Sequence, residues 1–138
     1  MPPAKIFVAV KSEPLATVVE ALHGYELCIA DNVQHGMRLL NEQHDIDIFI
    51  IGILFDDSKA MDLIKRVSSR KTATKQPILV VRLMSSQHEE VLKSTMKTMI
   101  ELKIVKEYLE VLHTHPGAKR MIRNLVEKYL PDEKLAAT

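Results

Sequence analysis

Basic and hydroxyl side chains gather where two apolar segments of the sequence end. Lys11 directly follows the first apolar run, and Arg82 lies within the run Ile78–Met84, which Ser85 and Ser86 follow. If both runs are strands of one open α/β sheet, these groups meet at the strand ends, where such sheets bind ligands. One interpretation is therefore an anion-binding site. The other is that both cations are solvated or ion-paired, as surface lysines and arginines usually are.

No spacing in the sequence is typical of a catalytic or metal site. Serine, histidine and acidic residues are present, but not in the arrangement of a hydrolase triad. The single cysteine, Cys28, lies in an apolar stretch without a catalytic signature. The closest histidines, His113 and His115, are two residues apart and would point to different sides of a helix. We therefore expect no enzyme activity, no metal site and no cofactor.

Length and charge exclude several classes of protein. A chain of 138 residues fits one domain. Nineteen basic and 18 acidic residues leave a formal net charge of +1, which gives no field that would attract nucleic acid or an anionic membrane. The longest apolar run, Ile48–Phe55, is far shorter than the ~18 residues of a membrane span. With a single cysteine and no internal disulfide, we expect a cytoplasmic protein without nucleic-acid or membrane partners.

Apolar runs rich in β-branched residues alternate with segments of helical period, which predicts parallel strands joined by crossover helices. The predicted strands are Lys5–Val10, Tyr25–Ala30, Ile46–Phe55 and Ile78–Met84. Helices are expected from near Pro14 to Gly24, after a cap at Asp31 or Asn32, and over Lys59–Ser69. The third strand is apolar almost throughout, as expected of a central strand that is covered on both faces.

The segment from Gln87 to His113 contains neither glycine nor proline, and its apolar residues recur mostly at three- and four-residue intervals. This spacing favours one long helix, with a fifth strand over residues 103–111 as the alternative. A helix of about 27 residues is ~40 Å long and would extend beyond a domain of this size. A last helix is expected from Pro116 to Leu130, followed by a tail that frays after Pro131.

An apolar face on a projecting helix needs a partner, and a second copy of the chain is the simplest one. The sequence therefore predicts a homodimer. The residues expected on this partner face are Met96, Met99, Ile100, Val105, Tyr108, Leu109 and Leu112.

Four segments, read in order, resemble the receiver domain of bacterial two-component response regulators. They are KIFVAVKSEPL, GYELCIADN, DIDIFIIGILFDDSKAMDLIKRV and PILVVRL. The resemblance implies an α/β fold, a doubly wound parallel sheet of receiver (flavodoxin-like) topology with strand order 2-1-3-4(-5). We expect a single domain over residues 1–138, with a receiver-like core over 1–84 and a helical C-terminal part over 87–130, remodelled around the long fourth helix.

The resemblance also implies where chemistry has been lost. In the family, two acidic residues after the first strand and an aspartate ending the third hold Mg²⁺, and that aspartate accepts the phosphoryl group. Here the resemblance places Lys11 and Ser12 at the acidic pair and Gly52 at the phosphoacceptor. Arg82 replaces the threonine or serine of the fourth strand, and Lys106 is the one counterpart of the lysine of the fifth.

These substitutions remove both requirements of aspartyl phosphorylation. Mg²⁺ needs carboxylates to offset its charge, and a lysine ammonium at the same place repels it. Gly52 offers no nucleophile. Asp56 and Asp57, just past the third strand, are the candidates for a displaced acceptor. We favour the other interpretation, in which they cap the following helix or pair with Lys11.

The sequence thus predicts a degenerate pseudo-receiver that signals by protein–protein interaction, independently of aspartyl phosphorylation, and dimerises through its C-terminal helices. The alternative is a small-ligand sensor that holds an anion or a nucleotide in the crevice at the strand ends.

Overall fold

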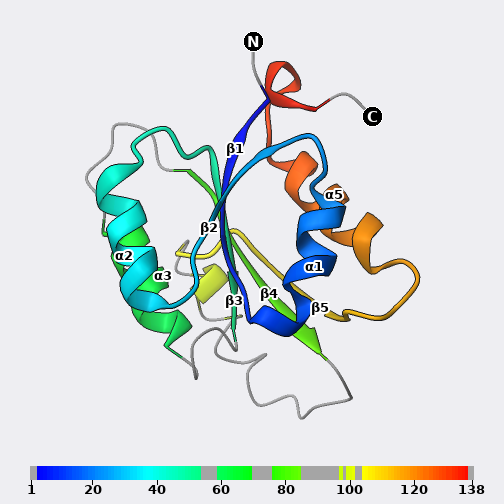
Figure 1. Cartoon of the computed structure of the whole chain (residues 1–138), viewed down its shortest axis with the longest axis horizontal. Helices are drawn as coiled ribbons and strands as arrows, with labels where there is room; N and C mark the ends of the chain where they lie inside the picture. The colour runs from blue at the N-terminus through cyan, green and yellow to red at the C-terminus, as the bar shows by residue number, and fades with distance from the viewer. Residues whose placement is uncertain are drawn as a thin grey trace.

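The computed structural model describes residues 3–53, 59–69, 76–84, 97, 99–101 and 104–136. Its centre is a five-stranded sheet in the order β2-β1-β3-β4-β5, in which every neighbouring pair is parallel (Figure 1). The strands are β1 Lys5–Ala9, β2 Glu26–Ile29, β3 Ile48–Gly52, β4 Ile78–Met84 and β5 Glu107–Leu112. The predicted doubly wound topology is therefore confirmed.

Helices cover both faces of the sheet (Figure 1). Two of them, α1 (Ser12–Ala21) and α5 (Ala118–Lys128), lie on one face, and α2 (Val33–Glu42) and α3 (Ala60–Ser68) lie on the other. A short 3-10 helix, η1 (Asp132–Lys134), follows α5. None of the helices in the described part of the chain has the length and apolar character that a membrane crossing requires.

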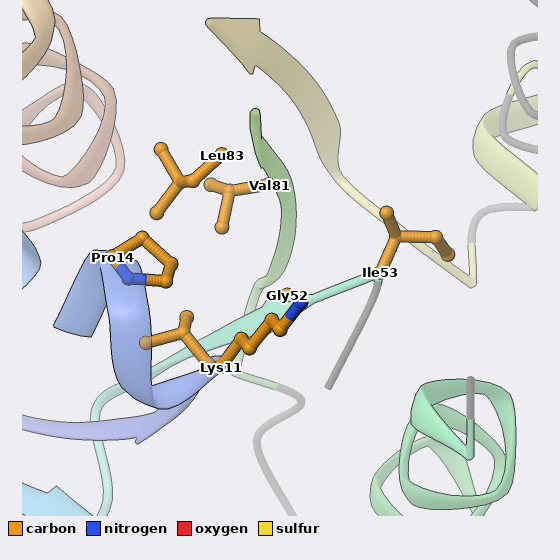
Figure 2. A pocket seen from close by; sticks show the side chains of 7 residues that line it. Lys11, Pro14, Gly52, Ile53, Val81 and Leu83 are labelled. Atoms are coloured by element: carbon orange, nitrogen blue, oxygen red, sulfur yellow. The ribbon is translucent and has the colours of Figure 1, made fainter. Parts of the chain in front are cut away.

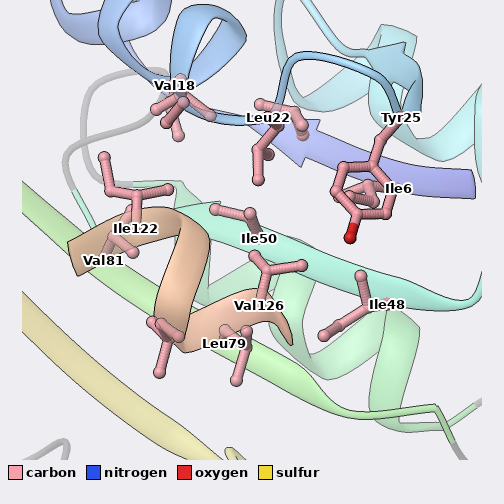
Figure 3. Close-up of a cluster of buried hydrophobic side chains, with 14 of the residues drawn as sticks. Ile6, Val18, Leu22, Tyr25, Ile48, Ile50, Leu79, Val81, Ile122 and Val126 are labelled. Atoms are coloured by element: carbon pink, nitrogen blue, oxygen red, sulfur yellow. The ribbon is translucent and has the colours of Figure 1, made fainter. Parts of the chain in front are cut away.

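The central strand β3 is buried at every residue, as its apolar sequence predicts. Successive side chains point to opposite faces, so that Ile48 and Ile50 join the core beneath α1 and α5 (Figure 3), whereas Phe49 and Ile51 join the core beneath α2 and α3. Each fully buried side chain of this size contributes roughly 1.5–3 kcal/mol relative to an exposed one. The two cores hold the strand ends in fixed register.

Local signals fix the ends of the first two helices. Gly24 has a φ of 98°, a left-handed conformation that glycine adopts without strain, and it turns the chain from α1 into β2. Asn32 caps α2, where its side-chain oxygen accepts a hydrogen bond from the backbone N–H of His35 at 2.8 Å.

The prediction of one long helix over residues 87–113 is wrong at its C-terminal end. Residues 107–112 form β5, which pairs with β4 along its whole length. The apolar spacing suggested one face of a helix. In the edge strand β5, however, the side chains alternate between the two cores. Tyr108 packs against the core on the α2/α3 side, whereas Leu109 and Val111 belong to the core on the α1/α5 side. The projecting helix, and the argument for a dimer that rested on it, therefore fall away.

The predicted partner face is accordingly not one surface. Met99 and Val105 are buried in the core on the α2/α3 side, and Leu109 packs against the opposite core. Tyr108 and Leu112 are half-buried, Ile100 is exposed, and Met96 lies outside the described residues. Most of these apolar side chains are at least partly covered by other parts of the same chain.

The chain after Pro131 was expected to fray, and through residue 136 this prediction is wrong. Ala136 is buried, and its backbone N–H donates to the Tyr25 hydroxyl at 3.1 Å. That hydroxyl donates in turn to Glu127 Oε2 at 2.6 Å. Burial and the hydrogen bond to Glu127 raise the pKa of Tyr25 above its ordinary value of 10.0. The tail is therefore anchored to the α1/α5 side of the domain.

We predict that Tyr25→Phe lowers the free energy of unfolding by roughly 1–3 kcal/mol at neutral pH, because a buried N–H loses its acceptor. The folded-state pKa of the phenol is raised, so its contribution is complete below the ordinary pKa of 10.0 and is lost as the pH rises further. Urea unfolding of both proteins at pH 7 and above pH 10 checks this, and equal stabilities at pH 7 would contradict it. Glu127→Gln, which keeps an acceptor for the phenol, is the milder control.

Candidate functional site

The carboxyl ends of β1 and β3 are in direct apolar contact. Gly52 ends β3, and a Cβ built on it would lie 3.3 Å from both Cα and Cγ1 of Val10, the residue after β1. Contacts this short are tighter than those a real side chain normally makes. A side chain at position 52, where the resemblance expects a carboxylate, would therefore crowd Val10.

Register explains this contact. Ala9 pairs with Ile51, so Val10 and Gly52 are the next residues along adjacent parallel strands and face the same side of the sheet. Ser12, which the sequence placed at the site, is instead the exposed first residue of α1 and does not line the cavity beside Gly52. Val10 is thus a site residue that sequence reasoning missed. The signal was available, because Ile6, Val8 and Val10 alternate along one face of β1.

A small cavity of about 10 Å³ lies over this contact (Figure 2). Its lining is Val10, Lys11, Pro14, Gly52, Ile53, Val81 and Leu83. This volume holds about one water molecule, and the lining is mostly apolar. The exposed side chain of Lys11 extends toward Gly52 (Figure 2), which gives the cavity a positive charge.

Arg82 does not join Lys11 at the cavity, because its neighbours Val81 and Leu83 take the cavity-facing positions of β4. The Arg82 side chain is buried on the other face, with Nη1 3.4 Å from Glu110 Oε2. Tyr108 donates a hydrogen bond of 2.8 Å to the same oxygen. Burial and this hydrogen bond raise the pKa of Tyr108. The guanidinium therefore has a carboxylate partner across the β4–β5 register and does not serve an anion site with Lys11.

At the carboxyl end of β5 the structure places His113 rather than a lysine. Its Nε2 lies 3.6 Å from Glu13 Oε1, and its carbonyl accepts a hydrogen bond of 3.4 Å from Thr17 Oγ1. Lys106 precedes β5, at the opposite end of the strand, where its Nζ lies 5.8 Å from the centre of the Tyr129 ring. Lys106 is therefore not the counterpart that the resemblance suggested. Sequence reasoning missed both His113 and Glu110 because it treated this segment as helix.

The remaining site predictions concern residues that the structure does not describe or does not bring together. Asp56, Asp57, Ser85 and Ser86 lie outside the described residues. Within the described ranges, no three histidine, cysteine, aspartate or glutamate side chains are placed to share a metal ion. Lys11 lines the cavity beside Gly52, and Arg82 does not.

No family model matches the sequence, and no curated protein matches it either. Solved structures do match the fold. The phosphorylated cyanobacterial phytochrome response regulator RcpA superposes with a TM-score of 0.75 at 13% identity, covering 99% of both chains. The Mn²⁺-bound response regulator Rcp1 gives 0.70 at 15% identity, covering 98% of this chain and 100% of its own.

A response regulator from Thermotoga maritima gives a TM-score of 0.65 at 17% identity, covering 92% of this chain and 97% of its own. Across this set nearly the whole of each chain superposes, while most residues differ. The chain therefore has the five-stranded α/β fold of response regulator receiver domains.

Proposed function

We propose that this chain is a cytoplasmic signalling protein of receiver fold that acts by binding other proteins and does not accept phosphate on an aspartate. The observation that carries the proposal is the contact between Gly52 and Val10. Position 52 offers no carboxylate, and a side chain there would crowd Val10.

The chemistry of phosphoryl transfer explains why this contact matters. Aspartyl phosphorylation needs a carboxylate nucleophile and a cation that offsets the charge of the transferred group. At this site the nucleophile position is Gly52, and Lys11 supplies a fixed positive charge that opposes binding of Mg²⁺. Because the nucleophile is missing and binding of the cation is opposed, we expect the reaction to be lost and not merely slowed.

Recognition is the function that a receiver fold can keep without this chemistry. Among the described residues, four large apolar side chains are exposed, and two of them, Val19 and Met121, lie on helices α1 and α5. Met121 belongs to the last helix, through which the sequence predicted dimerisation. A homodimer through this helix therefore stays part of the proposal, although the projecting helix does not.

We expect the protein to be inert toward phosphoryl donors. Incubation with acetyl phosphate and Mg²⁺ should leave the intact mass unchanged, and beryllofluoride with Mg²⁺ should not raise the melting temperature, since a ligand of the folded state would do so by mass action. A stoichiometric phosphoryl adduct would contradict the proposal. The variant Asp56→Asn with Asp57→Asn would then show whether either aspartate is the acceptor.

A second prediction concerns the steric closure of the site. Gly52→Ala should lower the free energy of unfolding by roughly 1–3 kcal/mol through overpacking, an effect that the lower flexibility of alanine partly offsets. In a Val10→Ala background the same change should cost less, because the Cγ1 contact is gone. Urea unfolding of the four proteins of this double-mutant cycle measures the coupling. Strictly additive effects would show that Val10 does not close the site.

A further inference from the structure

Helices α1 and α5 lie side by side on one face of the sheet (Figure 1), and their exposed sides carry opposite charges. The two acidic residues of α1, Glu13 and Glu20, are exposed, although Glu13 lies beside His113, and this helix contains no lysine or arginine. Helix α5 has four basic residues, of which the exposed ones are Lys119, Arg120 and Lys128. Its one acidic residue, Glu127, is half-buried and held by Tyr25 and Arg123.

Each helix also exposes one large apolar side chain. Val19 on α1 is 37% exposed and Met121 on α5 is 39% exposed. Where the two helices meet, Glu20 pairs with Lys119. From the helical period, Val19 lies on the flank of α1 away from this pair. Met121 shares its flank of α5 with Lys128, which pairs with Glu107 of β5. The two apolar side chains thus mark the two outer flanks of one charged surface.

This arrangement is complementary to itself. Both helices follow crossover connections from parallel strands, so they run in the same direction. A two-fold axis parallel to the helices places α1 of each copy against α5 of the other, so that two equivalent contacts form. The acidic helix then faces the basic one, and the outer flank with Val19 meets the outer flank with Met121.

We propose that this α1–α5 surface is the face through which two copies of the chain form a two-fold dimer, with α1 of each copy against α5 of the other. The inference rests on the proposed function in one respect, since it names the surface of the homodimer. Pairings of α1 with α1, or of α5 with α5, would bring like charges together and are disfavoured. Exposed ion pairs add little affinity, so the charges select the pairing and the apolar flanks stabilise it.

Light scattering of the full chain tests the dimer. The wild-type protein should show twice its 15.7 kDa mass at high micromolar concentration. Met121→Ser and Val19→Ser, both at exposed positions, should weaken self-association without lowering the melting temperature. Arg38→Glu, an exposed charge reversal on α2 at the opposite face of the sheet, is the matched control and should leave the mass unchanged.

Charge reversal tests the pairing of helices. One variant carries Glu13→Lys and Glu20→Lys on α1, and the other carries Lys119→Glu and Arg120→Glu on α5. Each alone should self-associate on the order of tenfold more weakly or worse, because both of its helices then bear the same sign. An equimolar mixture should recover a dimer of one copy of each. Repulsion within each chain persists in the mixture, so recovery reports contacts between chains.

Three results would overturn the inference: a wild-type mass of 15.7 kDa at all concentrations, a dimer that survives both charge-reversed variants and both serine variants, or no recovery on mixing while the folded state is intact by circular dichroism. If a charge-reversed variant does not fold, the two serine variants decide the question. None of these results bears on phosphorylation. Conversely, a phosphoryl adduct would end the proposed function and leave the dimer surface standing.

Discussion

The register between β1 and β3 brings Val10 onto Gly52, and the character of the whole carboxyl end of the sheet depends on this contact. In a parallel sheet the strand ends converge at one edge, which is where open α/β folds bind ligands. Here two adjacent strands meet through a valine and a glycine, beside a small cavity. Val10 belongs to the packed core, and Lys11 lines the cavity.

A second buried contact lies between β4 and β5, where an arginine is paired with a glutamate inside the fold. Arg82 is 6% exposed, and Glu110 stands opposite it in the β4–β5 register with Tyr108 bonded to the same carboxylate. Removing two charges from water is costly, and their attraction offsets that cost when the geometry is good and further hydrogen bonds complete it. The pair therefore gives β4 and β5 a preferred register. It also withdraws the arginine from any role at the cavity on the other face.

Features that local interactions determine were predictable from the sequence, and features that depend on contacts between distant segments were not. The first four strands were predictable because their apolar runs are short, rich in β-branched residues and bounded by turn residues. β5 was not, because its residues 107–112 fit a helical stripe as well as a strand, and pairing with β4 decides between them. The absence of a side chain at Gly52 was visible in the sequence. Val10 could have been found from alternation and register, whereas the partnership of Arg82 with Glu110 needed β5.

The proposed recognition surface and the carboxyl ends of the strands rest on one core. Val10 and Leu83, which line the cavity, also belong to the core beneath α1 and α5. Because that core is continuous and well packed, the closed edge supports the two helices in one arrangement. Under the function proposed above, a surface formed by these two helices would respond to the concentration of its partner and would need no chemical event at the sheet edge.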